Sequence, residues 1–291
     1  MHNIFKFLLL VCAGNIVVAC DSTPKTPTIP DGPAASINAV FKGLADNRPD
    51  FVWIAMPKSY QNDVNQLVGK WASLTEEDIY NSYMSLVKRF SIAVKQKRGM
   101  ILNTIMKMAP PGKRKQLGPM VDAFITMLNE ITNSQIMHHK KMVNANVGKF
   151  ISLHGSTLMK SFMKINTRAK TGIDRLTSTK IVQVSVTGDE AKLDIVKNGK
   201  PSGRPKVFVK IEGRWVPSDI QRHWNKQIAR VNRRLDKAKA SATSNNDKLR
   251  KTLPMLESFV KSFEDVKNEA QLASFPMRVM LLGQQLKSLV R

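Results

Sequence analysis

A change in hydrophobic period near the middle of the chain limits the folds that this sequence can adopt. Apolar and polar residues alternate in three segments, "IVQVSVT" (181–187), "AKLDIVK" (191–197) and "KVFVKIEGRWVP" (206–217). Such alternation is typical of strands that place one face on a core and the other in water. Because the turn-forming stretches "GDE" and "NGKPSGRP" separate the segments, the sequence predicts a three-strand antiparallel meander over residues 179–217.

Helical periodicity dominates on both sides of this meander. Apolar residues recur every three or four positions in several segments of the helical region 36–178, and again in the C-terminal helices 218–291. The sequence therefore predicts an α+β, mostly helical fold, in which a small three-strand antiparallel meander is flanked by long helices. The four tryptophans are expected in the core or as partly buried anchors: Trp53, Trp71, Trp215 and Trp224.

The N-terminus combines a basic residue, Lys6, with a short apolar run from Phe7 to Ala19. The run is shorter than the roughly 20 residues of a membrane-spanning helix and has the length of a signal-peptide core. It ends in Val17-Val18-Ala19-Cys20, which resembles the lipobox of bacterial lipoproteins: an aliphatic residue, a variable residue, a small residue and the invariant cysteine. The alternative is an ordinary signal peptide, or a core helix, in which the cysteine has no special role.

The lipobox resemblance implies a signal peptide over residues 1–19, cleavage before Cys20 and acyl chains on Cys20, and two or three such chains hold a protein stably at a bilayer. Residues 20–35 are predicted as a proline-containing tether, either polyproline-like or disordered. Since Cys12 would leave with the signal peptide, the mature chain would form no intrachain disulfide. The expected location is the bacterial cell membrane, facing the periplasm. Asp21 resembles a signal for the inner membrane, and the outer membrane is the alternative.

Two further segments carry a second resemblance. "EGRWVP" (212–217) resembles the closing strand of small cystatin-like and NTF2-like domains of exported bacterial proteins, and residues 39–65 are similar to helical openings of uncharacterised lipoproteins of this kind. The resemblance implies that Phe41 to Trp71 pack on the sheet and that residues 79–168 are a helical insertion. It also implies an alternative function, a small-ligand-binding module, which would need an apolar cavity between the sheet and its helices.

Basic residues greatly outnumber acidic ones, and the chain has a formal net charge of +24. Residues 79–121 contain nine lysines and arginines and no acid, and residues 192–239 contain fourteen basic and four acidic residues. Because a solvated surface usually mixes both signs, this pattern indicates either contact with a polyanion or a compositional habit of the lineage. After export the candidate partners are anionic lipid, an acidic envelope polymer or an acidic protein, and no nucleic acid is expected.

Two groups of cations form the predicted polyanion-binding surface. One lies in the turn before the third predicted strand. The other lies on the helix after the meander, where it would oppose the apolar residues Trp224, Ile228 and Val231. The alternative is an ordinary solvated helix face. The predicted residues are Lys197, Lys200, Arg204, Lys206, Arg222, Lys226, Arg230, Arg233 and Arg234.

Few residues in the sequence are placed for catalysis or metal binding. His138 and His139 are neighbours, so they point about 100° apart on a helix and do not form a metal-binding pair. The segment "HGST" (154–157) lacks the frame of a nucleophile turn, and His223 is expected at the surface. The sequence therefore predicts a non-enzymatic binding or structural role without cofactor or metal. An envelope hydrolase with an unrecognised site is the alternative.

Overall fold

The computed structural model describes residues 27–197 and 199–290. The predicted lipobox residues Val17, Val18, Ala19 and Cys20, together with Asp21, lie outside the described residues. Within the described ranges, no helix is both long enough and apolar enough to cross a membrane.

Helices occupy most of the chain before the sheet. They are α2 (Pro33–Ala45), α3 (Asp50–Ile54), α4 (Lys58–Ala72), α5 (Glu77–Gln96), α6 (Arg98–Met108), α7 (Arg114–Thr132), α8 (His139–Val143), α9 (Val147–Ile165) and α10 (Thr167–Thr177), with 3-10 turns at Pro111–Lys113 and Gln135–Met137. Asparagine side chains cap two of them. Asn146 Oδ1 accepts a hydrogen bond from the first turn of α9, and Asn166 Oδ1 accepts one from the first turn of α10.

An antiparallel sheet follows the first set of helices. Its main strands are β1 (Thr179–Thr187), β2 (Glu190–Lys197), β4 (Lys206–Ile211) and β5 (Arg214–Pro217), paired in the order β1-β2-β4-β5, and the two-residue strand β3 (Lys200–Pro201) pairs with β2. A bulge shifts the register of β1 between Gln183 and Ser185. One face of the sheet is covered by α2, whose partly buried apolar residues pack against Ile181, Ala191, Leu193, Phe208 and Trp215.

The segment predicted as the third strand forms two strands. Glu212 and Gly213 have φ angles of 49° and 75°, as in a two-residue hairpin turn, and Ile211 pairs with Arg214 across it. The Glu212 carboxylate accepts a hydrogen bond of 3.0 Å from the backbone N–H of Ser59 in the first turn of α4. Hydrogen bonding from Ser59 lowers the pKa of Glu212. The sheet has five strands where three were predicted, and the α+β, mostly helical class is confirmed.

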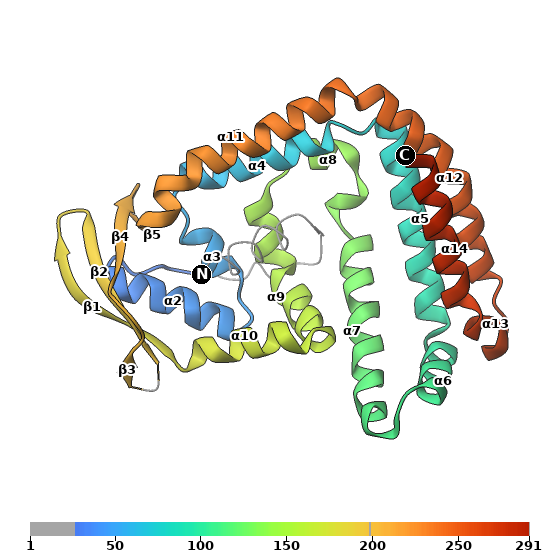
Figure 1. The fold of residues 1–291 in the computed structure, drawn as a ribbon, viewed down its shortest axis with the longest axis horizontal. Helices are drawn as coiled ribbons and strands as arrows, with labels where there is room; N and C mark the ends of the chain where they lie inside the picture. The colour runs from blue at the N-terminus through green and yellow to red at the C-terminus, as the bar shows by residue number, and fades with distance from the viewer. Residues whose placement is uncertain (1–26, 198, 291) are drawn as a thin grey trace.

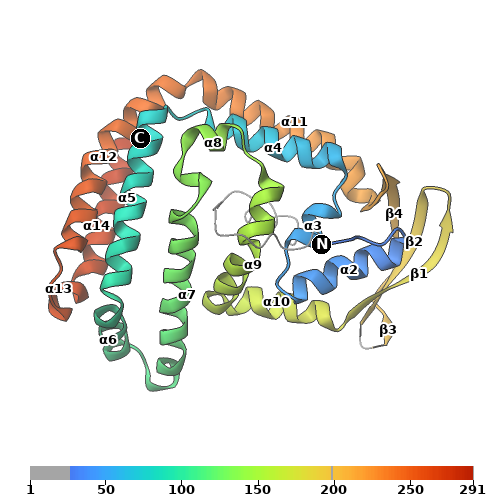
Figure 2. The same cartoon turned by 180° about the vertical axis from the view of Figure 1, so that it is seen from behind.

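The chain after the sheet is helical, with α11 (Ser218–Ala240), α12 (Ala242–Glu264), α13 (Glu269–Ala273) and α14 (Phe275–Val290). Helix α11 runs from the sheet along one edge of the molecule to a bundle in which α12 lies beside both α5 and α14 (Figures 1 and 2). Helix α7 packs against α5 on one side and α9 on the other. This arrangement makes α11 the connection between the sheet and the bundle.

Three clusters of buried side chains hold these elements together. The central cluster joins α3, α4, α9 and the start of α11 through residues such as Trp53, Phe150 and Trp224. A second cluster joins α5 and α7 to the C-terminal helices, and a third lies under the sheet. Trp71 is an exception to the predicted burial of the tryptophans, because it is 51% exposed.

The N-terminal part of the folded body differs from its sequence-based outline. Ile29 is buried, and the Trp215 indole donates a hydrogen bond of 2.7 Å to the backbone carbonyl of Asp31. The folded body therefore begins before residue 36, within the segment predicted as a tether. Of the segment from Phe41 to Trp71, the α2 portion packs on the sheet, whereas α4 packs on α8, α9 and α11.

Candidate functional site

Helix α11 places its apolar and basic residues on opposite faces. Trp224 is 5% exposed, and Ile228 packs against the same core cluster. The cations of the other face are all exposed, and they follow one another mostly at spacings of three and four residues, which places them along one side of the helix. We call this row the α11 stripe: Arg222, Lys226, Arg230, Arg233, Arg234 and Lys237.

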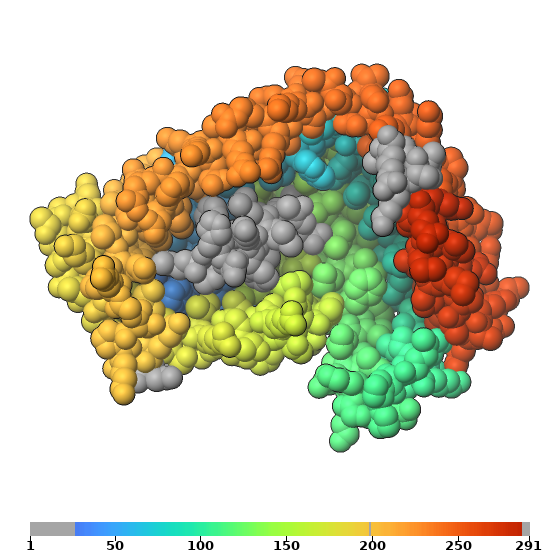
Figure 3. All heavy atoms as spheres, viewed as in Figure 1, coloured from blue at the N-terminus to red at the C-terminus, as the bar shows by residue number. Residues whose placement is uncertain are grey.

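Contacts with α4 determine which face of α11 points outward. The Trp224 ring stacks on Tyr60, with ring centroids 4.0 Å apart and planes 7° from parallel. The indole Nε1 of Trp224 also donates a hydrogen bond of 2.7 Å to Asp63 Oδ2. Further along, Lys70 Nζ donates a hydrogen bond of 2.7 Å to Asn232 Oδ1. These contacts hold one side of α11 against α4, so the exposed α11 stripe faces away from α4. Figure 3 shows α11 in orange along the edge of the molecule.

Few acids pair with the α11 stripe. Asp219 forms an ion pair with Arg222 three residues along the same helix. Asp236 also lies on α11 and is exposed, and it forms no ion pair in the described part of the chain. The cations of the stripe that have no ion pair with any described residue are Lys226, Arg230, Arg233, Arg234 and Lys237.

The acid-free stretch 79–121 differs from the α11 stripe, because three of its nine cations, Arg89, Arg98 and Lys107, pair with acids elsewhere in the fold. Arg89 binds Glu264 of α12, with a nitrogen–oxygen distance of 2.6 Å. The Nζ atom of Lys107 lies 2.5 Å from Oε2 of Glu269 in α13. Hydrogen bonding from Arg89 lowers the pKa of Glu264. Part of the positive charge of this stretch therefore joins α5 and α6 to the C-terminal helices.

The cations of the predicted turn are exposed, but they lie away from the α11 stripe. Lys200 lies in the short strand β3, and the three others lie just before and after it in the chain: Lys197, Arg204 and Lys206. Figures 1 and 2 show β3 at one end of the sheet, while α11 leaves from the other end. The structure thus divides the predicted polyanion-binding residues into two groups and brings only the α11 group together in one continuous row.

Of the histidines that the structure describes, His154 has the most enclosed environment. It is 2% exposed, and its Nδ1 lies 2.8 Å from Glu130 Oε2 of α7. Its Nε2 is buried and has no hydrogen-bond partner among the described residues. Neither of the two hollows described below contains this pair. The contact between His154 and Glu130 joins α9 to α7. His223, by contrast, is exposed on α11.

The space between the sheet and α2 is filled by side chains. Leu193 is fully buried there, and Phe41 of α2 packs against the same cluster. The described residues contain no group of three or more histidine, cysteine or acidic side chains arranged to hold a metal. The outer surface of α11 and two hollows are candidate places for ligand binding.

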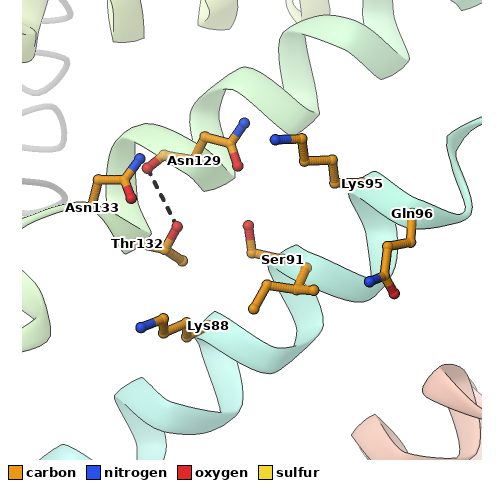
Figure 4. Close-up of a pocket in the computed structure, with 8 residues that line it drawn as sticks. Lys88, Ser91, Lys95, Gln96, Asn129, Thr132 and Asn133 are labelled. Atoms are coloured by element: carbon orange, nitrogen blue, oxygen red, sulfur yellow. Dashed lines mark hydrogen bonds between the residues drawn. The ribbon is translucent and has the colours of Figure 1, made fainter.

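A polar hollow between α5 and α7 is the feature that sequence reasoning missed (Figure 4). Its α5 wall carries Lys88, Ser91 and Lys95, whose spacings of three and four residues were visible in the sequence. No signal in the sequence showed that Asn129 of α7 and Asn133, directly after α7, would line the same hollow. The second hollow, about 430 Å³, lies around Trp53, Gln61, Asn146, Lys149 and Arg214, among other residues.

Comparison with known proteins gives no assignment for this arrangement. No protein-family model matches the chain, and no curated protein or solved structure matches it.

Proposed function

We propose that this chain is a lipid-anchored protein of the bacterial cell envelope with a non-enzymatic role, and that the α11 stripe binds anionic lipid headgroups. The observation that carries the proposal is the stripe itself, in which six exposed cations share one side of a helix and five lack an acidic partner among the described residues. The anchor rests on the lipobox resemblance of Val17 to Cys20. An acidic envelope polymer or an acidic protein is the competing partner.

The dimensions and charge of α11 suit a flat anionic surface. The helix has 23 residues, which corresponds to a length of about 34 Å. Each basic residue near an anionic membrane contributes about 1 kcal/mol, and the effect decays within a Debye length of roughly 8 Å at physiological salt. Four engaged cations would therefore contribute about 4 kcal/mol, and added salt would weaken the interaction.

The test uses the full chain reconstituted in vesicles, so that the anchor is the same in every sample. One set of vesicles contains phosphatidylcholine alone, and the other also contains phosphatidylglycerol. Acetylation of Lys226 and Lys237 is followed by mass spectrometry, with Lys113 and Lys115 at the exposed start of α7 as internal references. We expect the two α11 lysines to be protected on the anionic vesicles at low salt and to regain their reactivity at high salt. The reference lysines, Lys113 and Lys115, should react equally on the neutral and the anionic vesicles.

Charge reversal supplies the matched comparison. The triple variant Arg230→Glu, Arg233→Glu, Arg234→Glu should lose the protection of Lys226 and Lys237. The control variant Lys113→Glu, Arg114→Glu, Lys115→Glu makes the same change in net charge and should retain it. Because this variant lacks the two reference lysines, its α11 lysines are compared directly between neutral and anionic vesicles. Equal labelling on neutral and anionic vesicles would refute the lipid-binding role, and protection by a soluble acidic polymer in the absence of anionic lipid would assign the stripe to the polymer.

The anchor is tested separately by intact mass. Protein extracted from membranes should begin at Cys20 and carry the added mass of its acyl chains. The variant Cys20→Ser should lack this mass. A chain that retains Met1 in the membrane fraction would contradict the lipobox interpretation.

A further inference from the structure

The hollow between α5 and α7 has a volume of about 670 Å³ and a polar lining (Figure 4). Two lysines, two asparagines, a glutamine, a serine and a threonine face it, together with one apolar residue, and none of the lining residues is acidic. A lining of this kind does not suit a cationic ligand or a divalent metal, because its two lysines repel cations and no carboxylate offsets their charge. The lining residues are Lys88, Ser91, Ile92, Lys95, Gln96, Asn129, Thr132 and Asn133.

The two lysines supply positive charge at both ends of the α5 wall. Lys88 and Lys95 are seven residues apart, which is two helical turns, so their positions are separated by about 10.5 Å along the helix axis. Both are exposed, and neither forms an ion pair with a described residue. Two neighbouring cations do contact the C-terminal part of the chain: Arg89 pairs with Glu264, and Lys97 donates a hydrogen bond to the Val266 carbonyl. The hollow therefore contains cations that the fold itself does not use.

Ser91 provides a second, independent observation. The residue is only 3% exposed, yet its hydroxyl has no hydrogen-bond partner among the described residues. Ser82 of the same helix shows the usual alternative, in which the hydroxyl donates to the backbone carbonyl of Asp78 at 2.8 Å. In Figure 4 the Ser91 hydroxyl points into the hollow between the two lysines. Its oxygen is not one of the described side-chain atoms that are both fully buried and without a partner, so the hydroxyl is open to the hollow. It can therefore donate to or accept from a polar ligand there.

The α7 wall faces these groups with amides and a hydroxyl. Asn129 and Thr132 lie in the last turn of α7, and Asn133 follows them at its C-terminal end. The Thr132 hydroxyl donates a hydrogen bond of 3.3 Å to the backbone carbonyl of Asn129. Amide side chains both donate and accept hydrogen bonds, which suits ligands with adjacent hydroxyl groups. Ile92 is 48% exposed at the same hollow and offers an apolar contact for the C–H face of a sugar ring.

We propose that the hollow between α5 and α7 binds an anionic saccharide, a sugar that carries phosphate or carboxylate groups. Lys88 and Lys95 bind the anionic groups, and Ser91, Asn129 and Asn133 bind the hydroxyls. This site is separate from the α11 stripe and does not depend on it. It would give the protein specificity for a particular envelope glycan headgroup, in addition to a general attraction to negative charge.

The proposal is tested by isothermal titration calorimetry on the full chain in nonionic detergent micelles. The probes are fructose 1,6-bisphosphate, glucose 6-phosphate, glucose and inorganic phosphate. We expect affinity to decrease in the order bisphosphate, monophosphate, and then glucose and inorganic phosphate. Replacing either lysine, by Lys88→Gln or Lys95→Gln, should weaken bisphosphate binding about tenfold, because each removes a charge-assisted hydrogen bond. Ser91→Ala should weaken both sugar phosphates severalfold and leave inorganic phosphate unchanged.

Matched controls separate this site from the general charge of the chain. Lys115→Gln removes one exposed lysine outside the hollow and should leave sugar-phosphate binding unchanged. The α11 triple variant should also bind the probes normally, while the Lys88→Gln, Lys95→Gln double variant should keep the vesicle protection of Lys226. Inorganic phosphate binding as tightly as the sugar phosphates, or Lys115→Gln weakening binding as much as Lys95→Gln, would overturn the proposal.

Discussion

Replacing Trp224 by phenylalanine should reveal how much the contact with α4 contributes to holding α11. In the wild-type chain the indole stacks on Tyr60 at 4.0 Å and donates a hydrogen bond of 2.7 Å to Asp63 Oδ2. Phenylalanine keeps an aromatic ring at this position but has no N–H group. The Asp63 carboxylate would lose that donor, and the ring stack would become smaller.

The expected loss follows from these two contacts. A hydrogen bond to a charged group contributes about 1.5–3 kcal/mol, and an aromatic pair contributes about 0.5–1.5 kcal/mol, much of which phenylalanine retains. We therefore expect Trp224→Phe to lower the free energy of unfolding by about 2–3 kcal/mol. Urea unfolding followed by circular dichroism measures this change directly.

Trp71→Phe is the matched control, because Trp71 is 51% exposed at the other end of α4. The same chemical change should cost less than about 0.5 kcal/mol there. A double-mutant cycle between Trp224→Phe and Asp63→Ala should give a coupling energy of about 1.5 kcal/mol or more. A loss at Trp224 no larger than at Trp71, or a coupling energy near zero, would refute the claim that this hydrogen bond fixes the orientation of α11.

Two further predictions concern other contacts of the fold. A Cβ at position 69 would lie 2.4 Å from the backbone oxygen of Val143, so Gly69→Ala should destabilise the protein by about 1–3 kcal/mol in urea unfolding. Gly172→Ala, where no atom lies within 4 Å, should be neutral or stabilise by up to about 1 kcal/mol. Because Arg89 lowers the pKa of Glu264 below its usual 4.5, this pair stabilises the fold above about pH 4.5, and the contribution is lost as pH falls through the folded pKa. As the pH is lowered, the melting temperature of the Glu264→Gln variant should fall less than that of the wild-type protein. An equal fall in the two proteins would contradict this prediction.

The sequence predicted the fold class because the spacing of apolar residues, which distinguishes helices from strands, can be read from short segments of the chain. The alternation over residues 179–217 and the helical spacing around Trp224 each depend on neighbours within a few positions. The turn at Glu212 and Gly213 was missed because Glu212 adopts a left-handed conformation, which sequence reasoning does not expect of glutamate. A long-range contact, the hydrogen bond from Ser59, accompanies this conformation. The pattern of apolar residues continued through the turn and gave no sign of it.

The site was harder to predict than the fold, because it depends on pairs of residues that are distant in the sequence. The acid partner of Arg89 is 175 residues away, so an acid-free stretch of sequence does not become an acid-free surface. The α5–α7 hollow likewise joins Lys95 to Asn129 only through helix packing. Spacing along one helix predicted the α11 stripe, since all its members lie within residues 218–240.

Ion pairing within the fold therefore separates structural cations from those available to a partner. Arg89 and Lys107 each neutralise an acid of the C-terminal helices, and mutating them should affect stability first. Arg230 and Arg233 have no such acid among the described residues, so their replacement should affect binding and leave the unfolding free energy nearly unchanged. A net charge of +24 alone does not distinguish these two groups. The distinction comes from the acids that α12 and α13 place beside α5 and α6, and from the lack of ion pairs for five of the six cations of the α11 stripe in the described structure.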